Sequence, residues 1–69
     1  MSTIKVIELI GTSTKSWEDA ANNAIKGAAE TVSNITGLEI AHQTAKVENG
    51  KIVEYRANVK AAFIVQERK

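Results

Sequence analysis

The fold is decided by residues 52–65, which read IVEYRANVKAAFIV. Side chains two residues apart point to the same face of an extended strand, and here one such face is apolar throughout: Val53, Tyr55, Ala57, Val59, Ala61, Phe63 and Val65. The other face carries Glu54, Arg56, Asn58 and Lys60, joined by Ile52, Ala62 and Ile64. This period of two predicts a long strand with one buried face. The mixed-charge stripe is either a solvated surface or the lining of a ligand cavity or subunit interface.

Two further strands are expected on the N-terminal side of this segment. The dipeptide Asn49-Gly50 is typical of a tight hairpin turn, so residues 38–47 are expected to form the strand that precedes it. Residues 3–10 are rich in β-branched side chains and are followed by Gly11, which predicts a first strand.

A helix is expected between the first and second strands, from Trp17 to Asn34. Ser16 suits the N-cap, and Asp19 stands three residues later, where a capping acid is favoured. Apolar residues then recur every three or four positions, as on one buried helical stripe, and most of them are alanine: Trp17, Ala20, Ala21, Ala24, Ile25, Ala28, Ala29, Val32 and Ile35. Small side chains predict close packing, and Gly37 is expected to stop the helix. Residues 66–69 are expected to be a short polar end.

The resulting order is strand, helix, strand, strand, which predicts an α+β fold. We expect one domain over residues 1–69, in which an antiparallel three-stranded sheet wraps around one helix. A chain of 69 residues is near the lower limit for independent stability, because such cores supply only about 3–5 kcal/mol without disulfides, metals or oligomerisation. The sequence has no cysteine, so self-association is the expected source of extra stability.

The length of the third strand supports self-association independently. Fourteen extended residues span about 46 Å, whereas a globule of this chain length has a diameter of about 28 Å. The strand must therefore curl around the helix or project into a neighbour. Ile52, Ala62 and Ile64 are the candidate subunit contacts near its ends.

Composition excludes several classes of function. The formal net charge of +1 is not that of a dedicated nucleic-acid-binding protein. Apolar runs are too short for a membrane span or a secretory signal, so we expect a cytoplasmic protein with no membrane partner. No phosphate-binding loop or Ser-His-Asp signature occurs, and the single histidine, His42, has no positioned partner. We therefore expect no catalytic residue and no enzymatic activity.

Trp17 is either a stacking platform for a planar ligand or an anchor at the helix start, and its place on the apolar stripe favours the anchor. Four glutamates are scattered along the strands and turns, without the spacing of a calcium loop: Glu8, Glu39, Glu48 and Glu54. An oligomer that brings copies of them together at a symmetry axis would still offer a cation site, whose residues the sequence does not identify.

The order of several short motifs resembles the dodecin family. They are the strand and turn of residues 6–13, the alanines of the helix, Leu38-Glu39-Ile40, Asn49-Gly50, and Tyr55 followed by residues 59–63. Together they span residues 3–65. The resemblance implies a β-α-β-β subunit that assembles as a hollow homododecamer. It also implies a non-enzymatic shell that stores a small ligand, which in flavin-binding members is riboflavin or FMN, bound in pairs at two-fold axes.

Three positions of the implied flavin pocket are substituted in this chain. Gly37 stands where flavin-binding members have a stacking tryptophan, Arg56 where some have a glutamine, and Thr44 where bacterial members have an arginine. Loss of a stacked ring costs about 1–3 kcal/mol, so flavin binding is disfavoured, and Arg56 would favour an anionic ligand instead.

The segment Ser16-Trp-Glu-Asp-Ala20 resembles a divergent branch of the family that lacks the stacking tryptophan and includes a calcium-binding type. A calcium-binding shell is therefore one alternative, and a structural assembly without a specific ligand is another.

Overall fold

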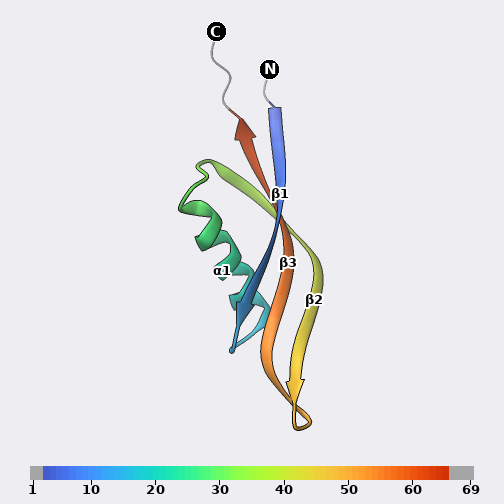
Figure 1. Cartoon of the computed structure of the whole chain (residues 1–69). Helices are drawn as coiled ribbons and strands as arrows, with labels where there is room; N and C mark the ends of the chain where they lie inside the picture. The colour runs from blue at the N-terminus through green and yellow to red at the C-terminus, as the bar shows by residue number, and fades with distance from the viewer. Residues whose placement is uncertain (1–2, 66–69) are drawn as a thin grey trace.

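The computed structural model describes residues 3–65 and has the expected element order. The elements are β1 (Thr3–Ser13), α1 (Trp17–Ala29), β2 (Ile35–Glu48) and β3 (Lys51–Val65). The three strands form one antiparallel sheet in the order β1-β3-β2, and α1 lies along one face of it (Figure 1). The β-α-β-β prediction is confirmed, and the segment that alternates most regularly in the sequence is the central strand.

The hairpin between β2 and β3 closes through a two-residue turn. Asn49 and Gly50 both have positive φ, at 53° and 76°, which is the signature of a type I′ turn. Glu48 and Lys51 are the last register pair before it. The hairpin predicted from the Asn-Gly dipeptide is therefore confirmed.

The helix begins where the sequence predicts but ends earlier. Ser16 is the N-cap, and its hydroxyl accepts a hydrogen bond from the Asp19 amide at 2.9 Å. The predicted end at Asn34 is wrong, since α1 stops at Ala29. The amides of Thr31 and Val32 both donate to the Ala28 carbonyl, which tightens the last turn.

The cause of the early stop lies in the residues after α1. Thr31 and Val32 are β-branched and gain little from continuing a helix, and Asn34 then adopts a left-handed φ of 65° that leads the chain into β2. The expectation that Gly37 stops the helix is also wrong, because Gly37 lies inside β2.

The sequence pattern predicted that the first strand ends before Gly11, but β1 continues to Ser13. A Cβ atom at Gly11 would lie 1.9 Å from the Ala20 carbonyl oxygen and 2.8 Å from the Ala24 Cβ. The glycine is required because the helix backbone rests directly on β1 at this point.

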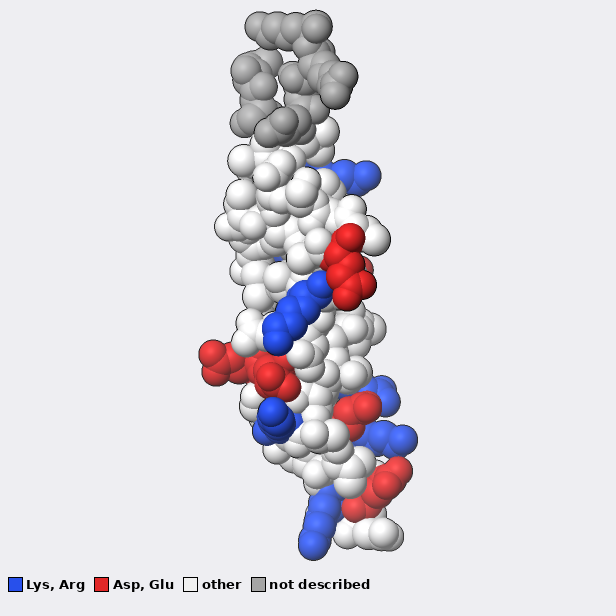
Figure 2. Space-filling model, turned by 90° about the vertical axis from the view of Figure 1, so that its left-hand side faces the viewer, with Lys and Arg blue, Asp and Glu red and all other residues white. Residues whose placement is uncertain are grey.

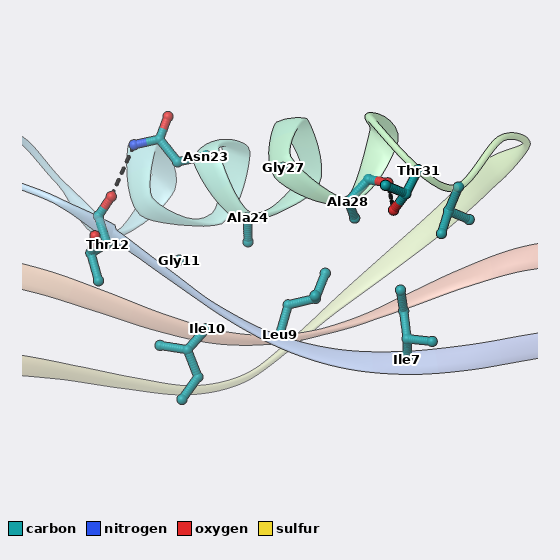
Figure 3. A pocket seen from close by; sticks show the side chains of 11 residues that line it. Ile7, Leu9, Ile10, Gly11, Thr12, Asn23, Ala24, Gly27, Ala28 and Thr31 are labelled. Atoms are coloured by element: carbon teal, nitrogen blue, oxygen red, sulfur yellow. Dashed lines mark hydrogen bonds between the residues drawn. The ribbon is translucent and has the colours of Figure 1, made fainter.

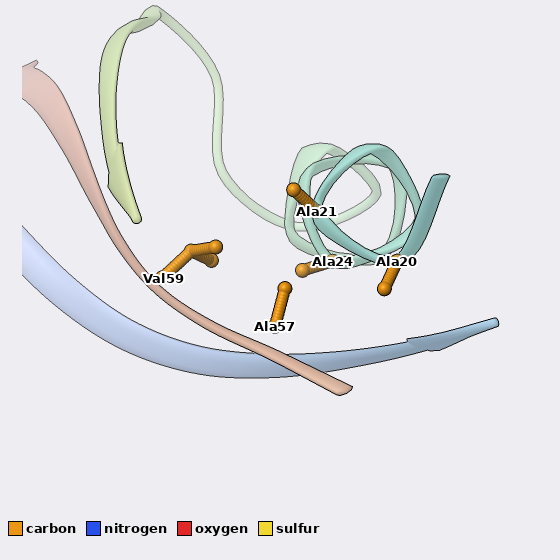
Figure 4. Close-up of a cluster of buried hydrophobic side chains, with 5 residues drawn as sticks. All are labelled: Ala20, Ala21, Ala24, Ala57 and Val59. Carbon is orange, nitrogen blue, oxygen red and sulfur yellow. The ribbon is translucent and has the colours of Figure 1, made fainter. Parts of the chain in front are cut away.

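The core is small and consists mainly of alanine, as the helical stripe predicted. Its central cluster contains Ala20, Ala21 and Ala24 from α1 and Ala57 and Val59 from β3 (Figure 4). Leu9 of β1 packs against this cluster. Short side chains let the helix lie close to the sheet, and they also limit the apolar area that one chain buries.

The molecule is far longer than a globule of its size. Its extents are 57 × 20 × 12 Å and its radius of gyration is 14.3 Å, against about 11 Å for a compact chain of this length. The prediction that the third strand is longer than a compact globule of this chain length is confirmed, and the whole molecule is elongated with it. Large apolar side chains remain exposed on all three strands, with Ile10 at 65% and Val47 at 59%.

Candidate functional site

Within residues 3–65, one face of the sheet carries no helix, and we call it the open face. Because Ala57, Val59 and Ala61 point towards α1, the alternating residues Arg56, Asn58 and Lys60 point away from it. The strand register shows which residues of the two outer strands share this face. On β1 they are Ile4, Val6, Glu8, Ile10 and Thr12. On β2 they are Gly37, Glu39, His42, Thr44 and Lys46. The open face is thus apolar at one end and charged over the rest.

All three pocket positions implied by the sequence lie on the open face. Thr44 is directly opposite Arg56, whereas Gly37 is opposite Ala62. Their partners on β3 are six residues apart, which corresponds to about 20 Å at 3.3 Å per residue. One chain therefore brings Thr44 and Arg56 together but not Gly37, and a small ligand that contacts all three positions must lie between copies.

The charge of Arg56 is paired within the same chain. Its Nε donates to Oε1 of Glu54 at 2.8 Å, and both side chains are partly exposed. An exposed pair of this kind contributes less than about 1 kcal/mol. A bound anion would nevertheless have to compete with Glu54 for the guanidinium group.

Gly37 leaves open space where flavin-binding relatives are expected to carry a ring. A Cβ atom at this position would contact only the Ala62 Cβ, at 3.8 Å. Within residues 3–65, the backbone therefore leaves room for a Cβ atom here, and the glycine is not imposed by a close contact.

Trp17 is an anchor at the helix start, as its place on the apolar stripe favoured. Its ring meets Tyr55 edge-on, with centroids 4.8 Å apart and planes at 79°. Its indole Nε1 donates to the Thr44 carbonyl oxygen at 2.7 Å. The indole thus ties α1 to the edge of the sheet just behind a candidate pocket position. Sequence spacing gives no signal for a contact across 27 residues.

Acidic side chains on the open face are separated by a lysine. Glu8 and Glu39 are both opposite Lys60, one on each side. Within residues 3–65, no group of three or more histidine, aspartate or glutamate side chains is close enough to hold a metal ion.

His42 is exposed and lies opposite Asn58, whose Oδ1 atom is buried without a hydrogen-bond partner in the described part of the chain.

The surface in Figure 2 shows lysine, arginine, aspartate and glutamate interspersed, with no large region of one sign. This mixed pattern agrees with the near-neutral charge of the sequence.

One hollow in the described part of the chain lies away from the candidate residues. It is a groove of about 590 Å³ between α1 and β1, with Leu9, Ala24 and Gly27 among its lining residues (Figure 3). Nδ2 of Asn23 donates across one end of it to the Thr12 carbonyl at 2.9 Å. None of the three pocket positions lines this groove.

The described residues, 3–65, contain no helix with the length and apolar character of a membrane span.

Comparison with known proteins gives consistent matches. The family model described as Dodecin matches residues 3–66. The calcium dodecin of Mycobacterium tuberculosis (strain H37Rv) is 36% identical over 63 residues, which cover 91% of this chain and 89% of that protein.

Solved structures match over nearly the whole chain. The dodecin from Streptomyces davaonensis superposes with a TM-score of 0.91 at 26% identity, covering 96% of this chain and 97% of that one. The calcium dodecin from Mycobacterium tuberculosis has a TM-score of 0.81 at 36% identity, covering 99% and 97%. Because the family model matches nearly the whole chain and these relatives share its fold, this chain belongs to the dodecin family.

Proposed function

We propose that this protein forms a homododecameric shell that binds and stores calcium in place of flavin, without catalysing a reaction. The observation that carries this proposal is the open face, which has no aromatic ring at Gly37 and has Arg56 paired to Glu54. The family supports self-association, and the exposed apolar side chains of all three strands give it a physical reason.

The loss of flavin binding follows from energetics at these positions. A stacked aromatic ring contributes about 1–3 kcal/mol per planar base, or roughly tenfold to over a hundredfold in affinity. Gly37 supplies none of this, and Trp17 cannot replace it because its indole is already bonded to Thr44 and packed on Tyr55. Thr44 also brings no charge for a phosphate group.

Calcium is favoured by the relative with higher sequence identity. At 36%, the calcium dodecin is closer in sequence than the Streptomyces davaonensis dodecin at 26%, although its TM-score is lower. Ligand identity depends on side chains more than on backbone path, so the sequence comparison is the more informative one here. Calcium prefers six to eight oxygen ligands, which exposed glutamates and backbone carbonyls of adjacent copies would supply.

The test is a thermal unfolding series on the assembled protein with calcium, magnesium, a chelator, riboflavin and FMN. A ligand at 100 times its Kd stabilises the folded state by about 2.7 kcal/mol. We expect calcium to raise Tm, the chelator to reverse the rise, magnesium to act less, and the flavins to leave Tm unchanged. A flavin-dependent rise without a calcium effect would contradict the proposal, and no response to any ligand would favour a purely structural assembly.

A further inference from the structure

The β2–β3 hairpin turns through the dipeptide Asn49-Gly50. Asn49 and Gly50 are both exposed and both adopt positive φ. A Cβ atom at Gly50 would meet no other atom within 4 Å. The turn also lies at the far end of the hairpin from the first residue of β1 (Figure 1). Its backbone is therefore open to chemistry that a packed loop would prevent.

An asparagine followed by glycine is prone to an intramolecular reaction, because glycine has no side chain to shield its backbone nitrogen. The chain contains five asparagines, and only Asn49 precedes a glycine. The others precede larger residues: Asn22 precedes Asn23, Asn23 precedes Ala24, Asn34 precedes Ile35, and Asn58 precedes Val59. Asn34 is a useful comparison, because it shares the left-handed conformation but is followed by a β-branched residue.

The folded turn opposes this reaction. In a type I′ turn the ψ of the first central residue is about +30°, which places the following nitrogen on the opposite side of the Cα–C bond from the asparagine side chain. Ring closure needs the two on the same side. The turn must therefore open before Gly50 can reach Asn49.

We propose that Asn49 is a site of spontaneous deamidation, and that the native turn restricts the reaction to molecules in which the end of the hairpin has opened. The Gly50 backbone nitrogen loses its proton and attacks Cγ of Asn49. A nitrogen–carbon bond forms, the bond from Cγ to Nδ2 breaks, and Nδ2 leaves as ammonia with that proton. Water then opens the five-membered succinimide at either carbonyl to give aspartate or isoaspartate, so water is the only co-reactant and no electron is transferred.

The product alters the hairpin in two ways. A new carboxylate beside Glu48 lowers the formal net charge of the chain from +1 to zero. Isoaspartate also adds one carbon to the main chain of a two-residue loop, which no longer fits the register of Glu48 with Lys51. The modification would therefore mark and loosen subunits whose hairpins have opened.

The test compares the assembled protein with the same full chain unfolded in concentrated urea, both held at mildly alkaline pH. Trypsin cleaves after Lys46 and Lys51, so residues 47–51 form one peptide that is resolved by liquid chromatography and mass spectrometry. We expect aspartate and isoaspartate forms of this peptide in urea. The native rate should be slower on the order of tenfold or more, because it scales with the open fraction.

Two variants sharpen the result. Asn49→Gly keeps a turn sequence suited to type I′ and should remove the mass gain. Ile52→Thr weakens the strand end beside the turn and should raise the native rate but not the rate in urea. Equal deamidation rates in folded and unfolded protein would overturn the proposal that the native turn restricts the reaction. Earlier deamidation at another asparagine, or none at Asn49 in urea, would overturn the site.

Discussion

Replacing Gly11 with alanine tests how closely the helix rests on the sheet. The new Cβ would lie 1.9 Å from the Ala20 carbonyl oxygen, whereas ordinary contact begins near 3.4 Å, so α1 and β1 must move apart. That shift separates Ala20 and Ala24 from Ala57, which together form much of the core cluster. Because the obstructing atom belongs to the backbone, a side-chain rotation cannot relieve the clash.

The expected cost is large for so small a domain. Overpacking costs about 1–3 kcal/mol, occasionally more, and this contact is at the severe end. A core of this size supplies only about 3–5 kcal/mol by itself. We therefore expect Gly11→Ala to lower Tm by more than 10 °C, since 1 kcal/mol corresponds to about 4–8 °C in a domain of this length.

This prediction is tested by circular dichroism during heating, with the native mass measured on the same sample. The matched control is Gly27→Ala, because a Cβ at Gly27 meets nothing within 4 Å and alanine gains about 0.8–1.0 kcal/mol over glycine inside a helix. The control should keep or raise Tm. If Gly11→Ala unfolds at the same temperature as the control, the close approach of α1 to β1 is refuted.

Three smaller changes test single contacts. Trp17→Phe removes the donor to the Thr44 carbonyl but keeps a ring beside Tyr55. Thermal unfolding should show a decrease of about 1 kcal/mol in the free energy of unfolding. An unchanged Tm would show that this hydrogen bond contributes nothing to stability. Ser16→Ala removes the N-cap and should cost about 0.5–2 kcal/mol, whereas Ser16→Asp should restore stability. Gly37→Trp supplies a ring at the position of Gly37. In calorimetry it should bind FMN roughly tenfold to over a hundredfold more tightly than Gly37→Leu, which supplies bulk without a ring; equal affinity in both would exclude stacking at this position.

Local signals in the sequence were sufficient for much of the fold. The alternation in residues 52–65, the Ser16 cap and the Asn49-Gly50 turn each depend on near neighbours, and the structure confirms all three. The helix end was missed because the apolar spacing of three and four continues through Val32 and Ile35, beyond the last helical turn. Gly11 was misread because the pattern of one strand does not show which backbone will approach it.

The candidate site was less predictable, since it depends on contacts between distant residues. No spacing rule places the Trp17 indole on the Thr44 carbonyl. The pairing of Arg56 with Glu54 joins residues two positions apart on one face, so alternation alone makes them neighbours, but it does not fix the geometry of the ion pair. The roles of Gly37, Thr44 and Arg56 stay predictions, because a single chain separates Gly37 from the other two.

The most direct test of the account is calorimetric titration of the purified protein with calcium, riboflavin and FMN, with native mass spectrometry on the same sample. We predict a mass of twelve chains, saturable heat with calcium and none with either flavin. Tight flavin binding by the assembly of that mass, with no heat on addition of calcium, would contradict the proposal that this protein binds calcium in place of flavin.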